Sequence, residues 1–516
     1  MCAKARRTAA KNAKAPKAPA AAPPPAHPAL YQINTRVWLN ELGTALGRPA
    51  TLDDIPDAAL DAFAAHGLDW IWFLSVWTTG EAGRRVSREN PEWRREFEET
   101  LPDLREEDIA GSGFAICAYK PAAELGGLRA LARLRKRLND RGMRLMLDFV
   151  PNHVALDHPW VKSHPEFFIA GTEDDLAREP HNFVRLAQKG KEVDRILAYG
   201  RDPYFPGWPD TLQLNYAEPA LQSAMIAVLK EIAARCDGVR CDMAMLLLSE
   251  VFERTWGRRA ESFWPRAIEA IRAEHPGFTF LAEVYWDLEW TLQQQGFDCT
   301  YDKRLYDRLR EGNARPVREH LLADPEFQRR SARFHENHDE PRAAAVFPLD
   351  QHRAAAVVAF LAPGLRFFHQ GQFQGRRQRI SPHLRRGPLE PADTEIGPFY
   401  GRLLAALREP SARFGNRTPL ECLPAWEGAE GWDSFIAGAW EAPGAPRLVV
   451  AVNYSPQPSK CYVRLPFSDL AGSEWRLEDL LSDALYDRSG DDLAAKGLFL
   501  DVPAWKPHVF KLTRLA

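Results

Sequence analysis

Arg240 and Asp242 stand two residues apart in a short stretch, Gly238-Val239-Arg240-Cys241-Asp242. On a β-strand, residues i and i+2 project from the same face. The guanidinium would then lie beside the carboxylate and favour its ionised form. A fixed carboxylate anion at a strand end suits a nucleophile, although the same two residues could also form a buried structural ion pair.

Further acids and histidines follow other apolar stretches of the chain. They are Asp148 with Asn152 and His153 beyond it, then Glu283, then the run His335-Glu336-Asn337-His338-Asp339. The carboxyl ends of parallel strands meet at one face of a barrel, so we expect these side chains to share one site. Converging carboxylates suit cleavage of a glycosidic bond. Metal binding is the alternative, but Arg240 beside Asp242 favours an ionised nucleophile over a ligand.

The elements that would position these residues alternate between apolar strands and amphipathic helices. This alternation is typical of a parallel sheet covered by helices. Helices are expected at 54–66, 127–141, 220–234, 264–274 and 304–309, and strands at 30–34, 67–74, 145–148, 238–242, 278–283, 297–300, 332–335 and 364–369, with a further apolar stretch at 113–119. About eight strands favour a closed (β/α)8 barrel over an open sheet.

Three segments depart from the alternation. Residues 154–212 are irregular and rich in Pro, Trp and Phe, which indicates an inserted subdomain. Residues 78–112 are polar and are expected to be a long loop after the second strand, with a role that the sequence leaves open. Beyond about residue 412, short alternating strands predict an antiparallel β domain. The expected organisation is a disordered Ala/Pro/Lys-rich tail at 1–28, a catalytic barrel at 29–411, the insert at 154–212 and a C-terminal domain at 412–516.

Composition limits the classes of partner. The chain has 516 residues, of which 45% are hydrophobic and 27% charged, as in a soluble globular protein. A net charge of −3 creates no field that would attract nucleic acid or an anionic membrane, and no apolar run is long enough to cross a bilayer. Seven widely spaced cysteines, with no CxxC pair, predict a reduced, cytoplasmic protein. Oligomeric state stays open.

The chain resembles the α-amylase family of retaining glycoside hydrolases. Four motifs carry the resemblance, in order along the chain: Asp148-Phe149-Val150-Pro151-Asn152-His153, Gly238-Val239-Arg240-Cys241-Asp242, Ala282-Glu283-Val284, and Phe334-His335-Glu336-Asn337-His338-Asp339. The resemblance covers residues 29–516. It implies a (β/α)8 TIM barrel with a subdomain inserted after strand 3 and a C-terminal antiparallel β-sandwich domain.

The resemblance also implies roles for single residues. Asp242 is matched to the nucleophile, Arg240 to the cation that orients it, Glu283 to the general acid/base and Asp339 to the acid that stabilises the transition state. The residues matched to substrate binding are Asp148, His153, Arg240, His338, Phe114 and Arg342. Three of these keep a structural alternative: His153 as a core histidine, Phe114 as core filling and Arg342 as an ion-pair partner.

Several positions differ from the family pattern. Met245 and Leu246 stand where many members have a Lys-His pair, and Gln213 stands where a calcium-binding Asp is usual. Calcium prefers several hard oxygen ligands, so the usual calcium site is expected to be lost, and no metal or cofactor is expected.

The expected function is therefore a retaining α-glycoside hydrolase for maltooligosaccharides, glycogen-derived glucans or a small α-glucoside, with carbohydrate as the partner. A transglycosidase with the same machinery is one alternative. A non-catalytic glucan-binding protein is another, although loss of the catalytic acids would be its sign and all three acids are present.

Overall fold

The computed structural model describes residues 24–186 and 194–515. Its centre is a closed barrel of parallel strands in the order β1-β14-β13-β12-β11-β10-β5-β2. Their bounds are β1 Ala29–Asn34, β2 Trp70–Leu74, β5 Arg144–Phe149, β10 Gly238–Cys241, β11 Thr279–Ala282, β12 Cys299–Tyr301, β13 Ser331–Phe334 and β14 Leu365–His369. The predicted (β/α)8 barrel is confirmed.

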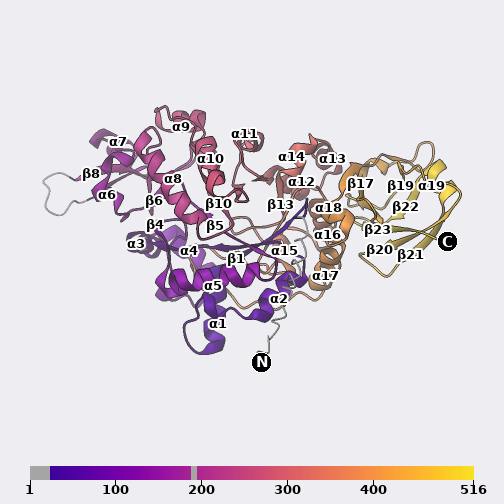
Figure 1. The fold of residues 1–516 in the computed structure, drawn as a ribbon, viewed down its shortest axis with the longest axis horizontal. Coiled ribbons are helices and arrows are strands. Elements are labelled where there is room, and N and C mark those ends of the chain that lie inside the picture. Colours follow the sequence, from indigo (N-terminus) through magenta and orange to yellow (C-terminus); the bar gives the residue numbers. More distant parts are fainter. Residues whose placement is uncertain (1–23, 187–193, 516) are drawn as a thin grey trace, which may run out of the picture.

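Helices cover the outside of the barrel (Figure 1). They include α1 Thr35–Leu46, α2 Asp57–Ala65, α5 Gly127–Asn139, α8 Pro219–Ala233, α9 Ser249–Trp256, α10 Trp264–Glu274, α11 Glu289–Gln294, α12 Lys303–Glu311, α13 Ala314–Leu321, α14 Pro325–Arg329, α15 Ala343–Val346, α16 Leu349–Phe360, α17 Ile396–Leu407 and α18 Pro410–Phe414. Leu131, Leu134 and Leu138 of α5 are buried at helical spacing, as an amphipathic helix against a sheet requires.

The segment after β2 differs from its prediction. Residues 78–112 form two helices, α3 Glu81–Glu89 and α4 Pro91–Thr100, so the expected long loop is wrong. Asn90 caps α4 by accepting from the backbone N–H groups of Glu92 and Trp93, and Pro91 occupies the first turn, where its missing N–H costs nothing. The stretch 113–119 contributes to β4 Ile116–Pro121, which pairs antiparallel with β3 Trp77–Thr79 outside the barrel.

The inserted subdomain is tied at its base by two short antiparallel strands, β6 His153–Ala155 and β9 Thr211–Gln213. Between them lie α6 Trp160–Ser163, α7 Glu173–Arg178 and the hairpin of β7 Phe183–Leu186 with β8 Arg195–Ala198. The inserted subdomain and the C-terminal domain lie on opposite sides of the barrel (Figure 1).

The C-terminal domain has two antiparallel sheets. One has the strand order β15-β17-β18-β23-β20-β21 and the other β16-β19-β22. The strands are β15 Asn416–Pro419, β16 Cys422–Pro424, β17 Phe435–Glu441, β18 Arg447–Asn453, β19 Ser459–Val463, β20 Glu474–Asp479, β21 Leu485–Ser489, β22 Leu498–Val502 and β23 Pro507–Arg514. Helix α19 Gly490–Lys496 connects β21 to β22. The domain has its own apolar core, which includes Phe435, Val449 and Phe510.

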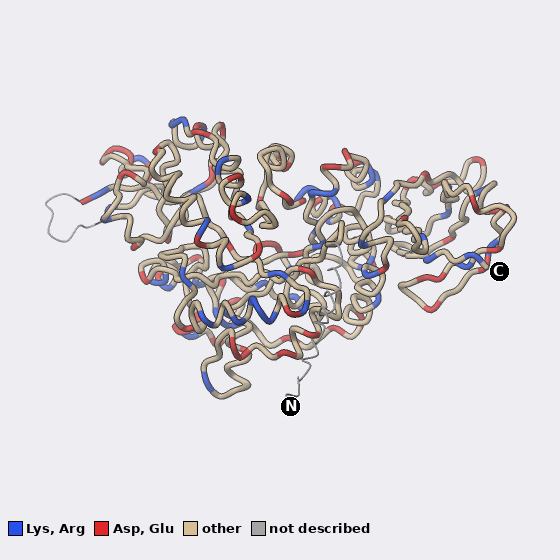
Figure 2. Tube along the Cα trace, in the orientation of Figure 1, with Lys and Arg blue, Asp and Glu red and all other residues tan. Residues whose placement is uncertain are grey.

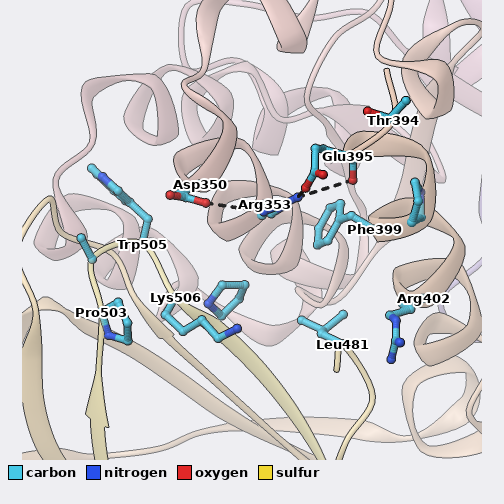
Figure 3. A pocket seen from close by; sticks show the side chains of 13 residues that line it. Asp350, Arg353, Thr394, Glu395, Phe399, Arg402, Leu481, Pro503, Trp505 and Lys506 are labelled. Carbon is cyan, nitrogen blue, oxygen red and sulfur yellow. Dashed lines mark hydrogen bonds and ion pairs between the residues drawn. The ribbon is translucent and has the colours of Figure 1, made fainter. Parts of the chain in front are cut away.

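A cavity of about 420 Å³ lies where the barrel meets the C-terminal domain. Arg353 of α16 donates to Glu395 at 2.8 Å and lies 3.6 Å from Asp350, and the loop at 503–507 closes the other side (Figure 3). Both acids next to Arg353 are already paired with it, so we interpret this cavity as a polar contact region between the barrel and the C-terminal domain.

His27 also joins the two domains. It is buried, its Nε2 donates to the Gly415 carbonyl at 3.1 Å, and its Nδ1 accepts from the Gly364 N–H at 3.0 Å. The predicted disordered tail at 1–28 therefore extends too far, because residue 27 is part of the folded core. Residues 1–23 of that tail lie outside the described residues.

Lys/Arg and Asp/Glu residues are interspersed along the trace (Figure 2). The basic helix α5 is an example, since Arg133 pairs with Asp53 at 2.6 Å and Arg135 with Asp237 at 2.7 Å. In the described ranges, no helix has both the length and the apolar character that crossing a membrane requires.

Candidate active site

Arg240 occupies the centre of the barrel mouth and binds two acids. Its Nη1 donates to Asp242 Oδ1 at 2.6 Å and its Nη2 donates to Glu283 Oε2 at 2.6 Å. Arg240 and Leu281 are paired across β10 and β11, which places the ends of the two strands side by side. Burial raises the pKa values of both carboxyl groups, and the nearby Arg240 opposes this rise.

Glu283 receives two further hydrogen bonds. The backbone N–H of Met243 donates to Oε2 at 2.8 Å, and the Tyr285 hydroxyl donates to Oε1 at 3.0 Å. Met243 has a left-handed backbone, with φ 41° and ψ 47°, and this turn directs its N–H at the carboxylate. Both oxygens of Glu283 are therefore fixed in place.

Asp339 is the most open of the three predicted catalytic acids, with 42% of its side chain exposed. His338 Nε2 lies 3.1 Å from Asp339 Oδ2, and Gln32 Nε2 lies 2.8 Å from His338 Nδ1. An amide N–H donating to Nδ1 leaves the proton of a neutral imidazole on Nε2, beside Asp339. Burial lowers the pKa of His338 to about 3, so the ring is neutral.

Asp148 is not among the residues that line the cavity at the barrel mouth. It is buried and accepts hydrogen bonds from the Trp72 indole at 3.1 Å and the Ser75 N–H at 3.0 Å, and it lies 4.0 Å from Arg240. The resemblance matches Asp148 to a structural or sugar-contacting acid, and its position beside Arg240 favours the structural role.

The remaining predicted binding residues divide into two groups. His153 and Phe114 line the cavity with Arg240, and the Arg240 guanidinium lies 5.2 Å from the centre of the Phe114 ring. His338 and Arg342 do not line it. Arg342 is buried and donates to Glu336 at 2.6 Å and to the Gln370 carbonyl at 2.8 Å. These contacts favour the ion-pair role of Arg342 over substrate binding.

The cavity at the barrel mouth, which we call the first cavity, has a volume of about 300 Å³. It is lined by the three acids and by twelve further residues: Trp93, Ser112, Phe114, His153, Trp208, Asp210, Thr211, Arg240, Met243, Tyr285, Pro382 and His383. Sequence reasoning missed Trp93, Asp210, Tyr285 and His383. Only Tyr285 carried a signal, since it stands two residues after Glu283.

A second cavity of about 800 Å³ adjoins the first. Met243 and Tyr285 line both, and the second cavity is otherwise lined by aromatic and charged residues that include Phe205, Trp286, Lys303 and Glu340. Both shared residues donate hydrogen bonds to Glu283, so Glu283 lies at the boundary of the two spaces.

The residues around Gln213 do not fit a calcium ion. The side-chain nitrogen of Gln213 donates to three oxygens, namely Asn152 O at 3.1 Å, Asn152 Oδ1 at 3.0 Å and Leu214 O at 3.1 Å. Oxygens that would ligate a cation are thus already satisfied by an amide N–H₂ group. Leu246 is buried and offers no oxygen ligand from its side chain.

Comparison with known proteins bears on this site. A family model described as the alpha amylase catalytic domain matches residues 112–302, the range that holds Asp148, Asp242 and Glu283. Residues 112–302 therefore belong to the α-amylase catalytic-domain family. Asp339 lies beyond the matched range, after the end of β13.

Curated relatives of the chain are distant. Alpha-amylase MalA of Haloarcula japonica is 24% identical over 389 residues, which are 73% of this chain and 53% of MalA. Trehalose synthase/amylase TreS of Mycolicibacterium smegmatis is 28% identical over 202 residues, which are 36% of this chain and 33% of TreS. The chain therefore spans about half, or less, of the length of these relatives.

Solved structures of the same fold cover nearly the whole chain. A maltogenic alpha-amylase, AmyB, from Thermotoga neapolitana aligns with a TM-score of 0.67 at 17% identity, over 95% of this chain and 99% of AmyB. An alpha-amylase from Lactobacillus plantarum aligns with a TM-score of 0.64 at 21% identity, over 94% and 99% of the two chains. These likenesses establish that the chain has the fold of these solved structures.

Proposed function

We propose that this protein is a retaining α-glycoside hydrolase. The observation that carries the proposal is the position of Arg240, which donates to both Asp242 and Glu283 at 2.6 Å. A single guanidinium can span only closely spaced carboxyl groups. This is compatible with double displacement, which uses a separation of roughly 5 Å, and the resemblance to retaining enzymes supports the same mechanism.

Each acid then has a distinct task. Asp242, kept ionised by Arg240, attacks the anomeric carbon as the bond to the leaving oxygen breaks, and Glu283 gives its proton to that oxygen. Glu283 next takes a proton from water, whose oxygen attacks the anomeric carbon. The bond from that carbon to Asp242 breaks, and the sugar is released with net retention. Asp339, open to the cavity, stabilises positive charge at the anomeric centre.

The proposed substrates are α-glucosides such as maltooligosaccharides, glycogen-derived glucans or a small α-glucoside. Support comes from the aromatic lining of the first cavity, Trp93, Phe114 and Trp208, because sugar rings pack on aromatic faces. A cytoplasmic location is part of the proposal, supported by the free thiols of all six cysteines in the described part of the chain.

Transglycosylation is a second candidate, favoured by the size of the second cavity. With about 800 Å³ beside Glu283, it has room for a sugar acceptor that could take the place of water. The glycosyl-enzyme is the same in both reactions, so the outcome depends on which acceptor reaches it.

One experiment tests the class of reaction. Wild-type protein and Asp242→Asn are incubated with a panel of α-linked gluco-oligosaccharides, and products are identified by mass and by anomeric configuration. The proposal expects α-configured products from the wild type and a loss of at least about 10³-fold in kcat for the variant. Initial β-configured products, or full activity of the variant, contradict it. Products longer than the substrate identify a transglycosidase.

A further inference from the structure

Two segments far apart in sequence are fastened together beside the first cavity. Helix α4 and the residues after it, 91–112, contact residues 379–386, which follow β14. The backbone N–H groups of Ala110 and Gly111 donate to the His383 carbonyl at 2.8 and 3.1 Å, and Phe97, Ile109 and Leu384 belong to one apolar cluster. We call these two segments the wall.

Ion pairs reinforce the wall. Arg386 lies 3.0 Å from Asp103 and 2.8 Å from Asp108, and Arg379 pairs with Glu96. Asp108 is buried, and a buried carboxylate in contact with an arginine is costly to separate. The wall is therefore a fixed part of the fold.

The wall presents four residues to the first cavity: Trp93, Ser112, Pro382 and His383. Trp93 and His383 pack with ring centroids 4.5 Å apart, and His383 Nδ1 lies 2.8 Å from the Ser87 hydroxyl. These contacts fix both rings, so the aromatic surface that they offer to a ligand is preorganised.

Asp210 completes the enclosure from the inserted subdomain. It is 3% exposed, it lines the first cavity, and its Oδ2 has no hydrogen-bond partner among the described residues. Burial raises the pKa of Asp210 to about 7. A buried acceptor without a partner is unfavourable by itself, and it becomes favourable when a ligand supplies the donor.

The direction of the substrate follows from Glu283. This residue protonates the leaving oxygen, so the leaving group lies on its side, towards the second cavity that Met243 and Tyr285 also line. The sugar that is attacked then occupies the first cavity. Its volume of about 300 Å³ is at the lower limit of small-molecule sites, roughly 300–1,000 Å³.

We propose that the wall restricts the first cavity to the non-reducing end of an α-glucan chain, and that Asp210 binds a hydroxyl group of that end sugar. The inference rests on the proposed glycosidase function and adds its mode of attack, which is exo rather than endo. A chain that continued beyond the cavity would have to displace Trp93 and His383.

The mode of attack is tested with two chromogenic maltoheptaosides that differ only at the non-reducing end, one free and one blocked by a 4,6-O-ethylidene group. The wild type is expected to cleave the free substrate at least about 100-fold faster than the blocked one. Binding of both compounds to Asp242→Asn is measured by calorimetry, and only the free compound is expected to bind.

The outcomes separate the two proposals. Equal cleavage of both compounds overturns the end selectivity and leaves the glycosidase function standing. Selective binding without cleavage overturns the function and leaves the end selectivity standing. Binding and cleavage of neither compound overturn both proposals.

Asp210→Asn tests the residue itself. The variant is expected to lose about 10- to 100-fold in kcat/KM on the free substrate, mainly through KM, with a melting temperature equal to or above that of the wild type. A lower melting temperature with an unchanged KM would assign Asp210 to the fold alone.

Trp93→Ala tests the wall, with Trp290→Ala as its control, since Trp290 is 43% exposed on α11 and lines neither cavity. Opening the wall is expected to raise the rate on the blocked substrate at least about tenfold, whereas the control leaves it unchanged. An unchanged rate in a folded Trp93→Ala variant contradicts the proposed wall.

Discussion

Tyr285 donates a hydrogen bond from its hydroxyl to Glu283 Oε1, with 3.0 Å between the two oxygens. Glu283 Oε2 is already bound by Arg240 and by the Met243 N–H. Every donor around Glu283 therefore favours the carboxylate, while burial favours the neutral acid. The balance between these opposing effects sets the fraction of Glu283 that carries a proton at a given pH.

Removing the Tyr285 hydroxyl is expected to shift that balance. Without this donor the carboxylate is less stable, so the pKa of Glu283 rises in Tyr285→Phe. Since catalysis needs protonated Glu283, the basic limb of the kcat/KM profile should move to higher pH by about 0.5 to 1 unit. Tyr462→Phe, in the C-terminal sheet, is the control. A basic limb that stays in place or moves to lower pH refutes the role given to Tyr285.

Arg240→Lys tests whether two carboxylates need one guanidinium. Each terminal nitrogen of Arg240 binds a different acid at 2.6 Å, and an ammonium group has a single nitrogen. We expect kcat to fall about 10²-fold or more, because either Asp242 or Glu283 loses its position. Steady-state kinetics on an activated α-glucoside measure this, with circular dichroism to verify folding. A kcat within a factor of two or so of wild type would mean that charge alone is sufficient.

The amide cluster around Gln213 predicts stability without calcium. The melting temperature should be the same, within about 1 °C, in excess chelator and in millimolar Ca²⁺, because the amide of Gln213 already occupies the oxygens that a calcium ion would bind at this site. A large drop in chelator would show that a bound cation stabilises the fold.

Gln213→Glu extends this prediction. A carboxylate in place of the amide would face three oxygens that lose their donor, which should destabilise the fold by about 2 to 4 kcal/mol. Added Ca²⁺ should restore part of this loss. Gln294→Glu, at an exposed position of α11, is the matched control and should change stability by less than about 0.5 kcal/mol.

His27 predicts an acid-sensitive contact between the barrel and the C-terminal domain. Its Nδ1 accepts from Gly364 N–H, so the ring must be neutral, and burial lowers its pKa from 6.5 to about 4. A lowered histidine pKa gives stability that is present above pH 6.5 and is lost as the pH falls towards 4. Between pH 7 and 5 this loss is roughly 2 kcal/mol.

His27→Ala removes that dependence. At pH 7 it should cost about 1 to 3 kcal/mol, because the buried Gly364 N–H loses its acceptor, and the difference from wild type should shrink towards pH 5. Urea unfolding at both pH values measures it, with His164→Ala, an exposed histidine, as the control. A difference from wild type that stays constant with pH would exclude titration of His27 as the cause.

Much of the barrel and the placement of its acids could be predicted from local pattern. Apolar strands with an acid at the carboxyl end are readable in one sequence, and parallel strands must bring those ends to one mouth. Asp242, Glu283 and Arg240 were found in this way. The spacing of Arg240 on β10 and Asp242 directly after it allows the hydrogen bond between them, because residues two apart in extended backbone share a face.

The inserted subdomain and the C-terminal sheets were also visible, since the alternation of strand and helix stops at their borders. Residues 78–112 were not, because their polar composition conceals the helices α3 and α4. The apolar side chains of α4 pack with residues 380 and 384, far along the chain. The same holds for His27, whose hydrogen-bond partners are residues 364 and 415.

The sequence by itself therefore determined the barrel and the acids at its mouth, since these depend on strand periodicity and on which end of a strand carries a charge. Only the tertiary structure decided what surrounds those acids and the rest of the site: the Met243 N–H on Glu283, the amide of Gln213 against Asn152, and Asp210 in one small cavity with Trp93 and His383. The reason is physical. Such contacts join residues tens to hundreds of positions apart, and nothing in the local pattern of either partner specifies the other.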